Sequence, residues 1–104
     1  QGAERLPAYC ASKGGLNNLI RQLAVEYGPD GVNVVGVAPG TTATELNAAV
    51  RERDPEWAEQ RRRGVPLGRL GTTEDVAELS AFLASDRAAY VTGEIVTVDG
   101  GVTA

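Results

Sequence analysis

Tyr9 and Lys13 are the two residues whose types and spacing best suit proton transfer. They are four positions apart, so on an α-helix they lie one turn from each other on the same face. The positive charge of an ammonium group favours the phenolate form of a nearby tyrosine. Tyr9 could therefore give and take a proton closer to neutral pH than a free tyrosine does. Lys13 is also the sole lysine of the chain, whose other basic residues are all arginines.

A long amphipathic helix is predicted to carry this pair. Pro7 suits its first turn, where the missing N–H needs no partner, and apolar residues then recur at intervals of three and four up to Tyr27. A Gly-Pro pair at 28–29 is a stop signal. Gly14 and Gly15 inside the helix each cost about 1 kcal/mol relative to alanine. They indicate either simple tolerance or the close approach of another backbone or of a cofactor.

The rest of the chain predicts an α/β fold. Two β-branched, largely apolar runs, 32–38 and 94–99, are typical of strands buried on both faces, as in a parallel sheet. Between them we expect three helices, which begin near residues 45, 54 and 73. The order of helix, strand, three helices and strand is the alternation of an α/β fold with parallel strands.

The segment after the first predicted strand is a second candidate site. Pro39 and Gly40 end the strand, and small residues with hydroxyl groups follow them. In open α/β sheets, ligands bind beyond the carboxyl ends of the strands. Backbone groups and hydroxyls here could therefore bind a carboxamide or a phosphate. Within this segment, Thr42 and Glu45 have the spacing of a capping box.

Composition limits the classes of function. The net charge of −4 argues against nucleic acid or an anionic membrane as a partner, and no apolar run approaches the ~18 residues of a membrane-spanning helix. The absence of histidine excludes Ser-His and Cys-His catalysis and histidine-based metal sites within this chain. Cys10 is the single cysteine, so no internal disulfide can form, and a reducing, cytoplasmic compartment is expected. Because methionine is absent, we expect the chain to be a fragment.

Taken together, these features resemble the C-terminal half of a classical short-chain dehydrogenase/reductase. The resemblance covers essentially all 104 residues, in order and at the spacing of that family. It implies the C-terminal portion of a Rossmann-like doubly wound parallel sheet, with two strands and about four helices. Residues 1–104 would then form a single partial domain that lacks the N-terminal nucleotide-binding half. The matching motifs are Tyr9-x-x-x-Lys13, Asn33 to Gly40, Thr44, Arg69 to Gly71, Glu74 to Ala77, Phe82 to Ser85 and Val91 to Gly101.

The same resemblance implies an NAD(P)-dependent oxidoreductase that interconverts a carbonyl and an alcohol of a small-molecule substrate. Tyr9 would be the general acid/base. Lys13 would hold the hydroxyls of the nicotinamide ribose and lower the pKa of Tyr9. Both residues would contact the cofactor, NAD or NADP. The nicotinamide carboxamide would be positioned by Pro39, Gly40, Thr42 and Thr44.

The sequence also departs from the family pattern. The glycine-rich nucleotide turn and the serine that polarises the carbonyl belong further upstream than the eight residues before Tyr9. Ser12 occupies a different place in the motif and is no substitute. Val35 stands where asparagine is frequent, Thr42 where valine or isoleucine is usual, and Thr73 replaces a common proline.

Two other interpretations stay open. One is a truncated, cofactor-free protein that acts as an interaction or assembly module. The other is an epimerase or dehydratase. It is less favoured, because those relatives usually lack the Pro-Gly-x-x-x-Thr and Val-Asp-Gly-Gly endings that this chain has. Two buried-type parallel strands need neighbours and helices on both faces. We therefore expect a homo-oligomer, a complementary N-terminal half or an exposed apolar edge, and we expect the isolated chain to be inactive.

Overall fold

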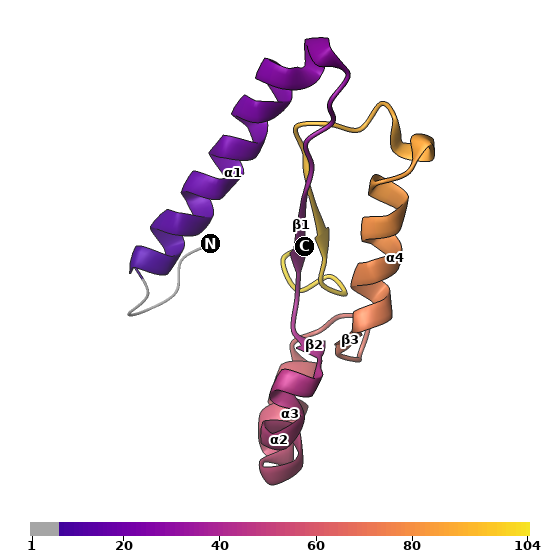
Figure 1. Cartoon of the computed structure of the whole chain (residues 1–104). Coiled ribbons are helices and arrows are strands. Elements are labelled where there is room, and N and C mark those ends of the chain that lie inside the picture. Colours follow the sequence, from indigo (N-terminus) through magenta and orange to yellow (C-terminus); the bar gives the residue numbers. More distant parts are fainter. Residues whose placement is uncertain (1–6) are drawn as a thin grey trace. The chain divides into compact units, whose positions relative to one another are not determined.

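The computed structural model describes residues 7–104, except for the side chains of Pro7 and Tyr9. Gln1 to Leu6, for which the sequence predicts the end of a loop, lie outside these residues. Figure 1 shows the helices and strands along the chain. They are α1 (Pro7–Tyr27), η1 (Gly28–Asp30), β1 (Gly36–Pro39), β2 (Thr42–Ala43), α2 (Glu45–Arg53), α3 (Pro55–Arg63), β3 (Gly71–Thr72), α4 (Thr73–Leu83), η2 (Asp86–Ala88) and β4 (Ile95–Val98).

The chain divides into two compact units. The first combines the residues up to Gly36 with Ser85–Val96, and the second combines Val37–Ala84 with Thr97–Ala104. Each unit therefore joins two segments that are distant in the sequence. Within residues 7–104, no helix is both long enough and apolar enough to cross a membrane.

Helix α1 confirms the predicted amphipathic helix, with Pro7 in its first turn and Tyr27 as its last residue. Figure 1 shows it as one unbroken helix. Its apolar face is covered only in part. Ala24 is buried, whereas Leu16 and Leu19 keep 49% and 50% of their surface exposed to solvent. The helix therefore packs through its C-terminal half in the part of the chain described.

Strand β1 begins at Gly36, later than the predicted run 32–38. The residues just before it bond to a distant segment instead of forming a ladder. The Asn33 Nδ2 atom donates to two carbonyl oxygens of segment 89–92, both at 2.9 Å. The Val34 amide donates to a threonine hydroxyl of the same segment at 2.9 Å. These bonds satisfy the backbone outside a sheet, so the strand is shorter than its apolar pattern indicates.

Strands β1 and β4 form the sheet that the sequence predicted. At one end the Gly36 amide donates to the Glu94 carbonyl at 2.9 Å, and at the other the Gly40 amide donates to the Val98 carbonyl at 3.0 Å. The partner numbers rise together, so the two strands run parallel. The expected α/β class with parallel strands and four α-helices is confirmed.

A second, smaller sheet was not predicted. The two-residue strands β2 and β3 pair in parallel, with Thr42 opposite Gly71 and Ala43 opposite Thr72. Both strands are too short to carry an alternating hydrophobic pattern. Their pairing connects the segment after β1 directly to the residues that precede α4.

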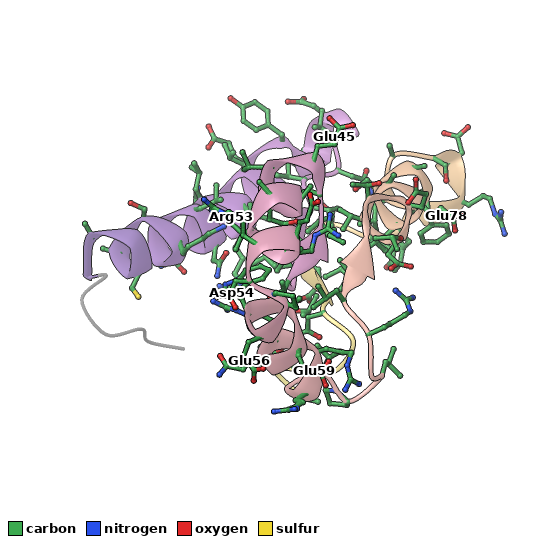
Figure 2. All side chains as sticks on the ribbon, turned by 90° about the horizontal axis from the view of Figure 1, so that it is seen from below. Glu45, Arg53, Asp54, Glu56, Glu59 and Glu78 are labelled. Atoms are coloured by element: carbon green, nitrogen blue, oxygen red, sulfur yellow. The ribbon has the colours of Figure 1, made fainter. Side chains whose placement is uncertain are left out.

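The three helices between the strands begin at polar caps. Asp54 caps α3 and accepts from the Trp57 amide at 3.2 Å, and Figure 2 shows it where α2 ends and α3 begins. Thr72 caps α4, as one of the two predicted threonines. The predicted capping box of Thr42 with Glu45 is wrong: Thr44 caps α2, because Thr42 belongs to β2.

Gly40 marks the point where the chain leaves β1. A Cβ atom at Gly40 would lie 2.8 Å from the Asp99 Cβ and 2.9 Å from the Asp99 Cα. The second of these atoms is backbone and cannot turn away. A side chain at this position would therefore force the ends of β1 and β4 apart. By contrast, a Cβ at Gly15 in α1 would meet no atom of the described residues within 4 Å.

We expect Gly40→Ala to lower the free energy of unfolding by about 1–3 kcal/mol, the usual cost of overpacking. Gly15→Ala is the matched control. It should raise the free energy of unfolding by about 0.5–1 kcal/mol, because alanine is the better helix former and has room. Urea unfolding followed by circular dichroism, without any added cofactor, measures both changes. Equal effects of the two substitutions would contradict the packing described for Gly40.

Candidate functional site

The predicted acid/base pair lies on α1. Tyr9 and Lys13 fall within the same continuous helix, which spans Pro7–Tyr27, so their backbones are one turn apart. The Tyr9 side chain lies outside the described residues, and the Lys13 side chain is exposed. The Ser12 hydroxyl donates to the Ala8 carbonyl at 2.9 Å, so this serine bonds to its own helix.

The surface of α1 beside this pair is open. At Gly14, as at Gly15, an added Cβ would meet no described atom within 4 Å. The close approach of another backbone, one of the two expected explanations for these glycines, is therefore not made by the described part of this chain. The helix offers a flat strip of backbone next to Lys13, to which a flat or bulky ligand could come close.

The second set of predicted residues follows β1. Pro39 is exposed, and Gly40 is held against Asp99 as described above. The Thr42 hydroxyl donates to the Gly40 carbonyl at 3.0 Å. This bond uses the Thr42 proton, so its oxygen can serve a ligand only as an acceptor. Gly40 and Thr42 therefore have structural roles besides the predicted ones.

Thr44 is held by a network that the sequence reasoning missed. Its amide donates to Asn47 Oδ1 at 3.0 Å, and its hydroxyl oxygen accepts from the Asn47 amide at 3.4 Å. Asn47 Nδ2 also donates to the Thr42 carbonyl at 2.7 Å. Arg51 donates from Nε to Asn47 Oδ1 at 2.9 Å and from a terminal nitrogen to the Thr44 carbonyl at 3.1 Å. The available signal was asparagine at the third helical position after a capping threonine.

Asp99 forms the turn after β4. Its carboxylate accepts from the Gly101 amide at 2.9 Å, and from the Thr103 amide at 3.0 Å and hydroxyl at 2.7 Å. The Thr103 hydroxyl, followed by the Gly101 amide, lowers the pKa of Asp99 below its ordinary value. Gly100 and Gly101 have φ angles of 65° and 98°, which other residues rarely adopt. The Val-Asp-Gly-Gly ending is thus a tight turn held by the Asp99 side chain.

A cavity of about 190 Å³ lies within the second unit. Its charged groups are engaged, because Asp99 bonds to its own turn and Arg69 holds Asp75 through two bonds of 2.7 and 3.2 Å. The surface that lines this cavity is therefore mainly apolar. The lining residues are Thr41, Thr42, Val65, Leu67, Arg69, Gly71, Asp75, Val76, Val98, Asp99 and Gly100.

The predicted site residues thus fall into two sets. Tyr9 and Lys13 belong to the first unit, and residues 39–44 belong to the second. Within the second set, the structure brings Gly40, Thr42 and Thr44 together through the bonds given above. Chemically, the first set offers a phenol and an ammonium group, and the second offers hydroxyl groups at the end of a parallel strand.

Comparison with known proteins places these features in one family of enzymes. A family model described as enoyl-(acyl carrier protein) reductase matches residues 1–103. In Xanthobacter autotrophicus, 2-(S)-hydroxypropyl-CoM dehydrogenase 3 is 47% identical to the chain over 106 residues, and the inactive 2-(S)-hydroxypropyl-CoM dehydrogenase 2 is 45% identical over 106 residues. Each match covers 99% of this chain but only 42% and 46% of those proteins, respectively.

A solved structure gives the same result. It is a crystal structure of an Agrobacterium tumefaciens protein, provisionally assigned as a 2-deoxy-D-gluconate 3-dehydrogenase, with bound NADP. It superposes with a TM-score of 0.88 at 40% identity, over 99% of this chain and 42% of that one. The chain therefore spans less than half the length of the relatives it matches.

The Arg69–Asp75 pair predicts a dependence of stability on pH. The Arg69 guanidinium, with the Thr72 amide, holds the pKa of Asp75 well below its ordinary value. The folded state therefore binds this proton less readily than the unfolded state, whose aspartates titrate near ~3.9. The stabilisation by Asp75 is complete above about pH 5, decreases as the pH falls below the unfolded value near ~3.9, and is lost as the pH falls through the folded pKa.

We expect Asp75→Asn to be less stable than the unaltered chain at pH 7, and the difference to shrink as the pH falls from about 5 to about 3. Urea unfolding at each pH measures it. Glu78→Gln is the control on the same helix, because Glu78 is exposed and bonds to no other described residue (Figure 2). A difference that stays constant over this pH range would contradict the pairing.

Proposed function

The chain belongs to the short-chain dehydrogenase/reductase family, and from this premise we propose that it carries the acid/base residues of an NAD(P)-dependent oxidoreductase. The observation that carries the proposal is the placement of Tyr9 and Lys13 on one unbroken helix. One helical turn separates them, which is the spacing that lets an ammonium group act on a phenol. The substrate is a small molecule with a carbonyl or an alcohol group.

The chain's own part in the reaction is proton transfer. When bound, the nicotinamide cofactor donates or accepts the hydride. The Tyr9 phenol gives its proton to the carbonyl oxygen in reduction, and takes the proton of the alcohol in oxidation. The Lys13 ammonium favours the phenolate form of Tyr9 through its charge. Lys13 also binds the hydroxyl groups of the nicotinamide ribose.

The hydroxyl groups after β1 suit the carboxamide of such a cofactor. The Thr42 proton is engaged by the Gly40 carbonyl, so Thr42 offers an acceptor. The Thr44 oxygen accepts from the Asn47 amide, and its proton has no acceptor among the described residues, so Thr44 offers a donor. A carboxamide presents both an NH₂ donor and a carbonyl acceptor. We propose that Thr42 and Thr44, with Pro39 and Gly40, hold that group of NAD or NADP.

The relatives support the reaction class and the cofactor. The two Xanthobacter autotrophicus relatives are both named as 2-(S)-hydroxypropyl-CoM dehydrogenases, and one of the two is named as inactive. The Agrobacterium tumefaciens structure with bound NADP is also named as a dehydrogenase. For the assembly, we propose a homo-oligomer or a complementary N-terminal half, since Leu16 and Leu19 leave apolar surface on α1 to be covered. The single cysteine supports a cytoplasmic location.

A second candidate function is a non-catalytic one. It is favoured by one observation: a relative that is 45% identical over 99% of the chain is named as inactive. In that case the chain would act as an interaction or assembly module, and Tyr9 and Lys13 would be remnants of the site. Cofactor binding and turnover distinguish the two candidates.

The test is a pair of substitutions in the intact protein. Tyr9→Phe should keep NADPH or NADH binding, measured by fluorescence titration, while hydride transfer with a panel of alcohols and ketones falls by about 10²–10⁴-fold. Lys13→Ala should weaken cofactor binding as well, because the ribose contact is lost. Absorbance at the nicotinamide band follows turnover.

Tyr27→Phe is the control for the phenol, since Tyr27 ends the same helix, about five turns away from Tyr9. It should leave binding and turnover unchanged. Cofactor binding that survives in Lys13→Ala, together with unchanged turnover in Tyr9→Phe, would exclude the proposed roles. Absence of both binding and turnover in the unaltered protein would favour the non-catalytic candidate.

A further inference from the structure

The Asn47 side chain bonds to Thr42 and to Thr44, two of the residues that the proposed function assigns to the cofactor. It donates from Nδ2 to the Thr42 carbonyl at 2.7 Å and accepts at Oδ1 from the Thr44 amide at 3.0 Å. We propose that Asn47 and Arg51 are positioning residues that set the Thr44 hydroxyl for the nicotinamide carboxamide. This inference rests on the proposed function and adds to it two residues that do not themselves touch the cofactor.

Arg51 fixes which way the Asn47 amide points. Its Nε–H donates to Asn47 Oδ1 at 2.9 Å, and the Thr44 amide donates to the same oxygen. If the amide group were reversed, its NH₂ would face these two donors and lose both bonds. With Oδ1 held in this way, Nδ2 must point to the Thr42 carbonyl. The guanidinium is suited to this task because its planar donors have a fixed geometry.

The network also limits where the Thr44 hydroxyl proton can point. The Thr44 oxygen accepts from the Asn47 amide, so the proton points away from the helix backbone. Two carbonyls of this segment accept bonds from the network, that of Thr42 from Asn47 and that of Thr44 from Arg51. The Thr44 hydroxyl donates to no other described residue, so its proton is left for a ligand. A hydroxyl that is already oriented loses less entropy on binding.

Helix capping alone does not require asparagine at position 47. Helix α4 has the same kind of box, in which the Asp75 carboxylate accepts from the Thr72 amide at 2.8 Å and the Thr72 hydroxyl accepts from the Asp75 amide at 3.1 Å. An aspartate can thus cap a helix of this chain. It cannot donate to the Thr42 carbonyl, which is the bond that asparagine adds. Asn47→Asp therefore keeps the cap and removes the positioning.

The experiment measures two ligands with the intact protein. NADPH contains the nicotinamide ring with its carboxamide, whereas ADP-ribose, used here as its 2′-phosphate, contains both riboses and lacks that ring. We expect Asn47→Asp to raise the dissociation constant of NADPH about tenfold, the order expected for loss of one well-made hydrogen bond. The dissociation constant of ADP-ribose should stay within about twofold. Arg51→Lys should act in the same direction, since a lysine lacks the fixed pair of nitrogens with which Arg51 donates to Asn47 Oδ1 and the Thr44 carbonyl.

Two controls separate positioning from folding. Asp54→Ala removes the cap of α3 without touching the segment 42–44, and Arg53→Lys changes the next arginine of α2, which bonds to no other described residue (Figure 2). Both should leave the affinity for NADPH unchanged. Amide hydrogen exchange without ligand gives an independent measurement: Asn47→Ala should speed exchange of the Thr44 amide about tenfold or more, because its acceptor is removed.

The outcomes are distinct. Equal losses of affinity for NADPH and ADP-ribose in Asn47→Asp would show a general structural defect and overturn the inference. Unchanged NADPH affinity in Asn47→Asp, with weakened affinity in Thr44→Ala, would overturn the inference and leave the proposed function standing. Unchanged affinity in Thr44→Ala, or binding of neither NADPH nor NADH by the unaltered protein, would reject the proposed role of Thr44 and this inference with it.

Discussion

The close approach of Gly40 to Asp99 is the constraint on which the second unit depends. Because Gly40 has no side chain, the end of β1 can lie against the Asp99 backbone, directly after β4. The Gly40 amide also donates to the Val98 carbonyl. The two strands therefore end side by side, as parallel strands must if a ligand is to lie beyond their carboxyl ends. From this point the next residues pair as β2 with β3, and the Thr44 cap starts α2.

The structure orders this segment through side chains as well as backbone. Thr42 bonds to Gly40, Asn47 bonds to both Thr42 and Thr44, and Arg51 bonds to Asn47 and Thr44. Such a network fixes the geometry of the segment before any ligand binds, which lowers the entropy cost of binding. In helix α1, by contrast, the regular helical repeat alone places Tyr9 and Lys13 one turn apart. The surface at Gly14 and Gly15 on this helix is open.

Burial within the described residues is sparse. The buried apolar residues are Ala24, Val65 and Ala88, and each is small or medium in size. Apolar side chains such as Leu16 and Leu19 remain half exposed. Parallel strands are normally covered on both faces, and the chain spans less than half the length of its relatives. These observations agree with the proposal that further protein, from a partner or from the remainder of such a domain, covers this surface.

The sequence by itself determined the family, the α/β class with its Rossmann-like parallel strands, the order of the helices and, to one of two threonines, the cap of α4. These depend on periodicity and on residues three or four positions apart, which local sequence reveals. Only the tertiary structure decided where β1 begins, why Gly40 is glycine and how Asn47 holds Thr44. The first two depend on distant residues, in segments 89–92 and 97–104, and the third on hydrogen-bond directions. The catalytic roles of Tyr9 and Lys13 stay a prediction.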